Sequence, residues 1–190
     1  MNEVRTLTAR GAARRTALLH AAIAVVAAGG SGSLTHRTVA ATAKASLASV
    51  TYHFSSIEDL RRSTFERALQ IVDDQLTETA ATGTADELPR LAADYVVALV
   101  THKRSAAAAV QEMIVAATHD PALRPTFHTY HERLAELLSP CVGGRTAGFA
   151  VAATLQGLIV TALTYPDLDA GRLHTSVLDQ INRLRVDPPE

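Results

Sequence analysis

The chain has 190 residues, of which 47% are hydrophobic and 19% are charged, so it can bury a substantial core and is not a disordered polyelectrolyte. Its formal net charge of −1 does not by itself indicate a partner, and its one cysteine, Cys141, excludes an intramolecular disulfide. The lone thiol is interpreted as a small buried apolar side chain in a protein of a reducing compartment.

Charge is distributed unevenly along the chain. Residues 1–67 hold nine Lys or Arg and four Asp or Glu, a formal charge of +5. The other 123 residues hold nine basic and fifteen acidic residues, a formal charge of −6. This asymmetry is typical of a polyanion-binding module joined to a body that does not bind polyanions.

The first half of the chain predicts four helices. Apolar residues recur with the helical period over residues 10–28, and Gly29 and Gly30 end that segment. Thr35 is expected to cap a short helix His36–Ala43, and Ser46 a second short helix over residues 47–53. Ser56 is expected to cap a long helix Ile57–Ala80, with Asp59 three residues later, much as in a capping box.

The second half predicts longer helices, near residues 86–102, 104–118, 121–139, 144–165 and 169–185. Turn residues or prolines separate several of them, as at Asp120-Pro121 and Tyr165-Pro166. We therefore predict an all-α protein of about nine helices, with a three-helix head over residues 1–55 and a helical ligand-binding and dimerisation body over residues 56–190.

No targeting or membrane-spanning segment is expected. The arginine-containing N-terminus is followed by a short apolar run that includes His20 and lacks a convincing cleavage site. The longest apolar run, TAGFAVAATLQGLIVTAL, contains Gln156 and two glycines, which favours a buried interface helix over a membrane span. We expect a cytoplasmic protein.

Two short helices joined by a tight turn, 36–43 and 47–53, form a predicted helix-turn-helix. In such a unit the second helix enters the major groove of DNA. Val39, Val50 and Phe54 are expected to pack against helix 10–28, which leaves the other side chains to face the DNA. The predicted DNA-binding residues are Thr35, Arg37, Lys44, Ser46, Leu47, Ala48, Ser49, Tyr52 and His53.

The second of these helices lacks the usual base-reading side chains. Residues 46–54 contain no Arg, Lys, Asn or Gln, so bidentate contacts to guanine or adenine are not available from this segment. Specificity would then come from apolar contacts, water, DNA shape, or Arg37 and the N-terminal arm.

Residues 14–66 resemble the DNA-binding head of the TetR family of bacterial transcriptional regulators. The run AKASLASVTYHFSSIEDL, residues 43–60, aligns without a gap with that family's pattern. The matching residues are Ala43, Ser46, Tyr52, Phe54, Ser56, Glu58 and Leu60. The sequence departs from the pattern at Lys44 and Ala48, where the family commonly has glycine, and at Ile57, where it often has lysine.

The resemblance implies a homodimer that binds a palindrome on double-stranded DNA, and a body that binds a small-molecule effector and moves the two heads. Small residues on helix 144–165 and apolar ones on helix 169–185 independently favour a four-helix dimer interface; the alternative is that both helices close the core of the monomer. The predicted interface residues are Gly148, Ala152, Leu155, Ile159, Leu173, Val177 and Ile181.

An effector pocket is expected between helices 86–139 and 144–165, with apolar walls and a few polar groups. The candidates are Tyr95, Met113, His119, Phe127, Tyr130 and Gln156, although each could be ordinary core. His128 and His131 have a spacing that can ligate a metal, but solvated histidines are the favoured interpretation, and no cofactor is predicted.

Three alternatives remain open at this stage. The head could have lost DNA binding and left a ligand-binding protein, or the body could sense a metal or haem. An enzyme is disfavoured because no nucleophile elbow, phosphate loop or carboxylate pair is recognisable. A ligand-responsive DNA-binding regulator, acting as a repressor, is the prediction that the residues favour most.

Overall fold

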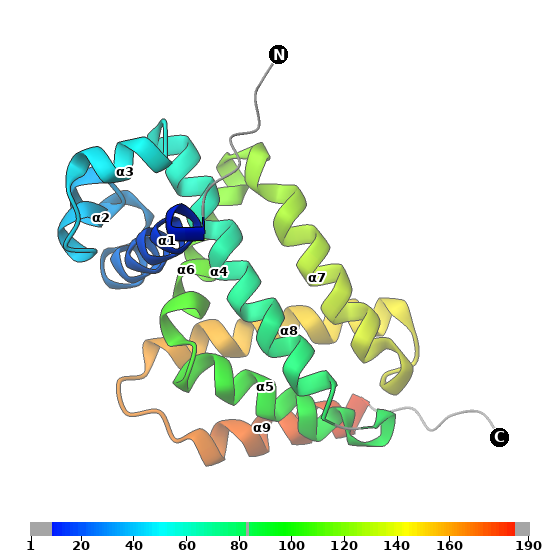
Figure 1. The fold of residues 1–190 in the computed structure, drawn as a ribbon. Coiled ribbons are helices and arrows are strands. Elements are labelled where there is room, and N and C mark those ends of the chain that lie inside the picture. The colour runs from blue at the N-terminus through cyan, green and yellow to red at the C-terminus, as the bar shows by residue number, and fades with distance from the viewer. Residues whose placement is uncertain (1–8, 83, 185–190) are drawn as a thin grey trace.

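The computed structural model describes residues 9–82 and 84–184, and these residues form nine α-helices and no strand. Helices α1 to α3 gather at one side as a head, α4 runs from the head along the body, and α5 to α9 complete the body (Figure 1). The helices are α1 (Ala9–Gly29), α2 (His36–Thr42), α3 (Leu47–His53), α4 (Ile57–Ala80), α5 (Leu88–Thr101), α6 (Arg104–His119), α7 (Arg124–Leu138), α8 (Arg145–Thr164) and α9 (Ala170–Leu184). The predicted all-α fold is confirmed.

The predicted helix ends agree with the structure because the capping residues act locally. Thr35 accepts a hydrogen bond from the backbone of Thr38, Ser46 from Ser49, and Ser56 from Asp59. The largest difference is at α7, which was expected to begin at Pro121. Asp120 instead caps a short 3-10 turn over Pro121–Leu123, and α7 begins at Arg124 with Pro125 in its first turn.

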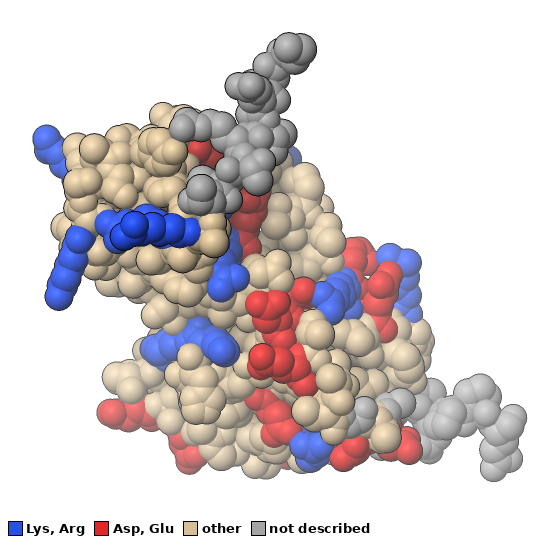
Figure 2. All heavy atoms as spheres, in the orientation of Figure 1, with Lys and Arg blue, Asp and Glu red and all other residues tan. Residues whose placement is uncertain are grey.

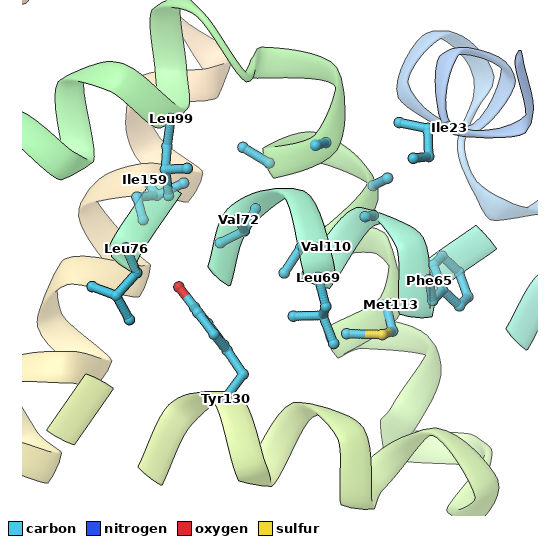
Figure 3. Packing of buried hydrophobic residues seen from close by; sticks show 14 of the residues in the cluster. Ile23, Phe65, Leu69, Val72, Leu76, Leu99, Val110, Met113, Tyr130 and Ile159 are labelled. Atoms are coloured by element: carbon cyan, nitrogen blue, oxygen red, sulfur yellow. The ribbon is translucent and has the colours of Figure 1, made fainter. Parts of the chain in front are cut away.

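The core runs without interruption from the head into the body. Val39, Val50 and Phe54 are fully buried in this core, as the sequence predicted. Helices α4 and α6 pack together at the centre, where Phe65 and Leu69 of α4 lie near Met113 of α6 (Figure 3). In the body α9 packs mainly on α5, and α8 mainly on α7.

A glycine sets how closely α7 and α8 approach. A Cβ atom added at Gly148 of α8 would lie 2.4 Å from the backbone oxygen of Ala135 and 2.6 Å from Oγ of Ser139. No heavy atom lies within 4 Å of the equivalent position on Gly157, which is nine residues, about two and a half turns, later on the same helix and therefore on the opposite face. The small residues of α8 therefore lie on two different faces, one packed closely on α7 and one open.

Helices α1 and α8 are long and apolar enough to cross a membrane, judged by length and composition alone. Core helices of soluble proteins pass the same test, and 33% of the apolar window of α8 is already buried against the rest of the chain.

Replacing Gly148 with alanine is expected to lower the free energy of unfolding by about 1–3 kcal/mol, because the added methyl group must push α7 and α8 apart. Urea denaturation measures the difference. The control is Gly171→Ala in α9, where the nearest atom would be 3.4 Å away. That change should raise stability by less than about 1 kcal/mol through helix propensity. Equal effects of the two changes would contradict the close α7–α8 contact.

Candidate functional site

Helix α3 presents a surface at the end of the head. Its first turn is fixed by Ser46 as the N-cap, and Val50 and the following Phe54 anchor it to the core. This leaves Leu47 45% exposed and Tyr52 61% exposed, with Ala48 and Ser46 also at the surface. A two-turn helix held from one side in this way offers its other side for insertion into a groove.

Two side chains fasten α3 to its neighbours. His36 of α2 lies with Nε2 3.1 Å from the backbone oxygen of Phe54. Arg15 of α1 donates to Oγ of the buried Ser63 at 2.9 Å, and its guanidinium lies 5.1 Å from the centre of the Phe54 ring. Arg15 therefore holds the head together, and it contributes less free charge to the surface than the sequence suggests.

Arg14 is a candidate that the sequence analysis did not place in the site. Its Nε lies 3.4 Å from Oγ of Ser49, so a guanidinium from α1 reaches α3. The spacing of Arg10 and Arg14, one turn apart on α1, was the signal that could have indicated it. The N-terminal arm that the sequence analysis named, residues 1–8, lies outside the described residues.

The described part of the head carries cations only. Residues 9–55 include Arg10, Arg14, Arg15, Arg37 and Lys44 and no Asp or Glu. Figure 2 shows blue side chains protruding from the head, whereas most of the red ones lie over the body. Arg37 is exposed at the start of α2, and Lys44 is exposed at the turn before α3. A surface of this charge attracts a phosphate backbone.

His53 contributes no charge at neutral pH. Burial, together with Arg15 and Arg14 nearby, lowers the pKa of its imidazole. Its ring makes an edge contact with Tyr52, with centroids 5.2 Å apart. His53 thus supports the orientation of Tyr52 as a neutral aromatic group.

The turn before α3 keeps a left-handed residue although it lacks the expected glycine. Lys44 has a φ of 49°, while its backbone N–H donates to the oxygen of Ala41 at 3.2 Å. The N–H of Ala45 donates to the oxygen of Ala40 at 2.9 Å. These hydrogen bonds fix the turn, and a lysine occupies a conformation that costs a side chain about 1 kcal/mol or more.

In the body, Tyr95 of α5 and Tyr130 of α7 meet between the helices. Their hydroxyl oxygens are 2.5 Å apart, and both residues are buried. In Figure 3 the hydroxyl of Tyr130 points toward Val72 and Leu76 of α4. Burial raises the pKa of Tyr95 well above its usual range and that of Tyr130 to about 12, so both hydroxyls stay neutral.

The other expected effector residues are dispersed. Met113 is fully buried among core side chains, whereas His119 is exposed in the last turn of α6 and does not line the interior. Phe127 packs against His131, and Gln156 has a buried amide nitrogen with no hydrogen bond in the described structure. Of the six expected residues, Tyr95 and Tyr130 are in direct contact, and the direction of their side chains decides this.

One cavity lies beside the tyrosine pair. It opens between α4, α5 and α7, is lined almost wholly by apolar side chains with Tyr95 among them, and has a volume of about 20 Å³. Space of this size holds about one water molecule, so an effector would have to separate α7 from α4 and α5.

The two histidines of α7, His128 and His131, lie in different surroundings. His128 is exposed, whereas His131 is only 7% exposed and lies against the rings of Phe127 and Phe149, 5.6 and 4.6 Å away between centroids. Burial lowers the pKa of His131. Among the residues that the structure describes, no three His, Cys, Asp or Glu side chains are grouped to hold a metal ion.

The seven residues predicted at a dimer interface all lie inside the protomer. They are buried because α8 packs on α7 and α9 packs on α5, and these contacts use their apolar sides. Sequence analysis could not separate this intramolecular contact from an intermolecular one, since both favour small and apolar residues. Any partner must contact the opposite, exposed faces of α8 and α9.

Comparison with known proteins fits this architecture. The model of the tetracyclin repressor-like C-terminal domain matches residues 83–185. The chain belongs to the TetR family. The matched region is the body from the end of α4 onward, whereas the resemblance found in the sequence covered the head. Among curated proteins, none matches the chain.

Solved structures extend the TetR likeness over both parts of the chain. A member of the TetR family from Streptomyces coelicolor A3 has 28% identity and a TM-score of 0.76, covering 91% of this chain and 98% of its own. The multidrug binding protein EbrR, in complex with imidazole, has 28% identity and a TM-score of 0.68, covering 93% of this chain and 97% of its own. EbrR was also solved with ethidium.

Lys44→Gly is expected to raise the free energy of unfolding by up to about 1 kcal/mol, because glycine adopts a positive φ without a Cβ clash. The control is Lys44→Ala, which removes the same charge and keeps the Cβ atom. Chemical denaturation of the three proteins compares them. A gain for alanine as large as that for glycine would show that charge, and not the left-handed backbone, causes the effect.

Proposed function

We propose that this TetR-family protein is a ligand-responsive transcriptional regulator, a repressor that binds a palindromic operator as a homodimer. The observation that carries the proposal is the exposed side of α3, where Leu47, Ala48 and Tyr52 project from a head whose described residues hold five cations and no acid. Two such heads would contact successive major grooves about 34 Å apart. We further propose that the protein acts on DNA in the cytoplasm and that it is not an enzyme.

Different residues of the head would contact the phosphates and the bases, and this supports sequence-specific binding. Arg37, Lys44 and Arg14, which are exposed, would contact phosphates and so fix the orientation of α3 on the DNA. Leu47 and Ala48 are suited to thymine methyl groups, and the hydroxyl of Tyr52 to a sugar or phosphate. With no bidentate base reader in α3, much of the discrimination would come from the shape of the operator.

Helix α6, together with α4, would transmit a movement of the body to the head. This helix packs against both α1 and α4, and Oε2 of its Glu112 accepts a hydrogen bond of 2.9 Å from the backbone N–H of Ser31, just after α1. An apolar effector that entered beside Tyr95 and Tyr130 would displace α4 or α7, and α4 leads directly into the head. Effector and operator would then weaken each other's binding reciprocally. The EbrR complexes make a small-molecule effector a reasonable expectation for this chain.

A second copy of the chain is the partner that the outward face of α8 suits. Residues 146–164 contain no Asp, Glu, Lys or Arg, although an exposed helix face in solution normally carries charges. The exposed positions recur every three or four residues, and Val160 among them is 43% exposed. Most of them are small, and they are Thr146, Phe149, Ala150, Ala153, Thr154, Gly157, Val160, Thr161 and Thr164. Small side chains on this face allow two α8 helices to approach closely.

DNA binding is tested by fluorescence anisotropy with the DNA that flanks the gene and with a shuffled fragment, over a range of salt concentrations. We expect preference for the native fragment and a steep loss of affinity with salt. Tyr52→Ala should weaken specific binding roughly tenfold. The matched control is Tyr165→Ala, which removes an equally exposed tyrosine from the far end of α8 and should change nothing. Equal affinity for both fragments would contradict the proposed operator recognition.

The dimer is tested by light scattering after size-exclusion chromatography. Gly157→Arg should convert the dimer to monomer, because it places a charge at the centre of the proposed interface while the protomer has room for the side chain. Ala122→Arg adds the same charge at an exposed position before α7 and should leave the dimer intact. A monomeric wild-type protein, or a dimer that tolerates Gly157→Arg, would rule out this interface.

A further inference from the structure

A groove between the head and the body has no role in the proposed recognition of DNA or effector. It lies where α1 and α4 meet the turn between α5 and α6 and has a volume of about 550 Å³. His20 and Ile23 come from α1, Arg67 and Ile71 from α4, and Lys103 and Arg104 from the turn and the start of α6. Figure 2 shows a blue patch at this junction of head and body.

Positive charge in the groove is not neutralised by the described residues. Three cationic side chains, Arg67, Lys103 and Arg104, line it together with His20 and His102, and no Asp or Glu does. The guanidinium of Arg104 donates to the backbone oxygen of Leu163 at 2.7 Å, a neutral acceptor. A cluster of like charges without a counter-charge is unfavourable, so the groove is suited to an anion.

Arg67 gives the strongest local indication. Its Nε is buried and has no hydrogen-bond partner in the described structure. Its NH2 group lies 3.3 Å from Nε2 of His20, and both burial and Arg67 lower the pKa of His20, so the imidazole is a neutral acceptor there. Because Nε is closed to solvent, an anion in the groove would contact the terminal nitrogens of this guanidinium, which face a neutral imidazole and no carboxylate of the groove lining.

The start of α6 adds to the positive potential at the same place. The helix has no acidic residue in its first turn, its N-cap Lys103 makes no side-chain cap, and Ser105 and Ala106 of the first turn also line the groove. Backbone N–H groups at a helix start carry partial positive charge, and cations there are unfavourable unless an anion binds. Lys103 and Arg104 therefore lie at the positive end of the α6 dipole, where their charges repel the partial charge of the helix start.

We propose that this groove binds a small phosphate-bearing anion, held by Arg67, Lys103, Arg104 and the N-terminus of α6. Guanidinium and ammonium groups beside a helix N-terminus are the donors that phosphate oxygens prefer. Ile23 and Ile71 line the groove as well and would contact the organic part of such a ligand. Because the groove joins α1 to α6, an anion there fixes the head relative to the body, and its effect on DNA affinity rests on the proposed function.

Isothermal titration with inorganic pyrophosphate, at constant ionic strength and without DNA, tests the site. Wild type should bind saturably, and Arg67→Gln and Lys103→Gln should each weaken binding roughly tenfold, because each removes a charge-assisted contact. Arg183→Gln is the matched control, since it removes one exposed cation from the distant α9 and should bind like wild type. Lys103→Gln also guards against misfolding, because the described structure shows no hydrogen bond or ion pair of the Lys103 side chain that would be lost. Circular dichroism will verify its fold.

The outcomes separate the site from its regulatory use. Absence of saturable binding, or equal weakening in all three variants, would overturn the anion site. Binding that follows the expected pattern establishes the site, and DNA titrations with and without pyrophosphate then measure coupling. An operator affinity that changes in wild type but not in Lys103→Gln would assign regulation to the groove, whereas failure to bind DNA at all would count against the proposed function only.

Discussion

The head depends on the burial of one aromatic side chain. Phe54 follows α3 directly and is fully buried, and the three other helices of this region converge on it. Arg15 of α1 covers its ring and continues to Ser63 of α4, while His36 of α2 lies against its backbone oxygen. Helices of seven residues, such as α2 and α3, have almost no stability by themselves. Their position therefore comes from this junction, and so does every proposed contact to DNA.

Helix α6 has a comparable importance between head and body. Its interior side packs on α4, its Glu112 holds the segment after α1, and its first turn opens into the cationic groove. An effector beside Tyr95 would contact α4, α5 and α7, and an anion in the groove would contact α1, α4 and α6, so both would act on α4, against which α6 packs. This arrangement would couple ligand binding to the position of the head, because a helix packed on both sides moves as a unit and does not deform gradually.

The small residues of α8 lie on two faces with different surroundings, and composition alone does not distinguish them. Small residues permit close approach of helices, and the sequence contained many of them. Gly148 uses that freedom inside the protomer, against the backbone of α7, whereas Gly157 points outward with space around it. Both glycines look alike in sequence, and only the packing of α7 on α8 distinguishes them. For the same reason the seven predicted interface residues belong to the core, and the proposed interface lies on the uncharged face behind them.

The sequence by itself determined the helices, the buried residues of the head and the concentration of positive charge there. These features follow from local chemistry: capping residues satisfy nearby N–H groups, apolar spacing follows the helical period, and charge can be counted along the chain. Tertiary structure alone decided which side chains meet across long distances in the chain. It brought the hydroxyls of Tyr95 and Tyr130 into contact and left His119 on the surface. It also placed Arg14 beside Ser49, and Arg67 in the same groove as Lys103. Such meetings depend on the angles between helices, which are set by packing of the whole core and not by any one segment.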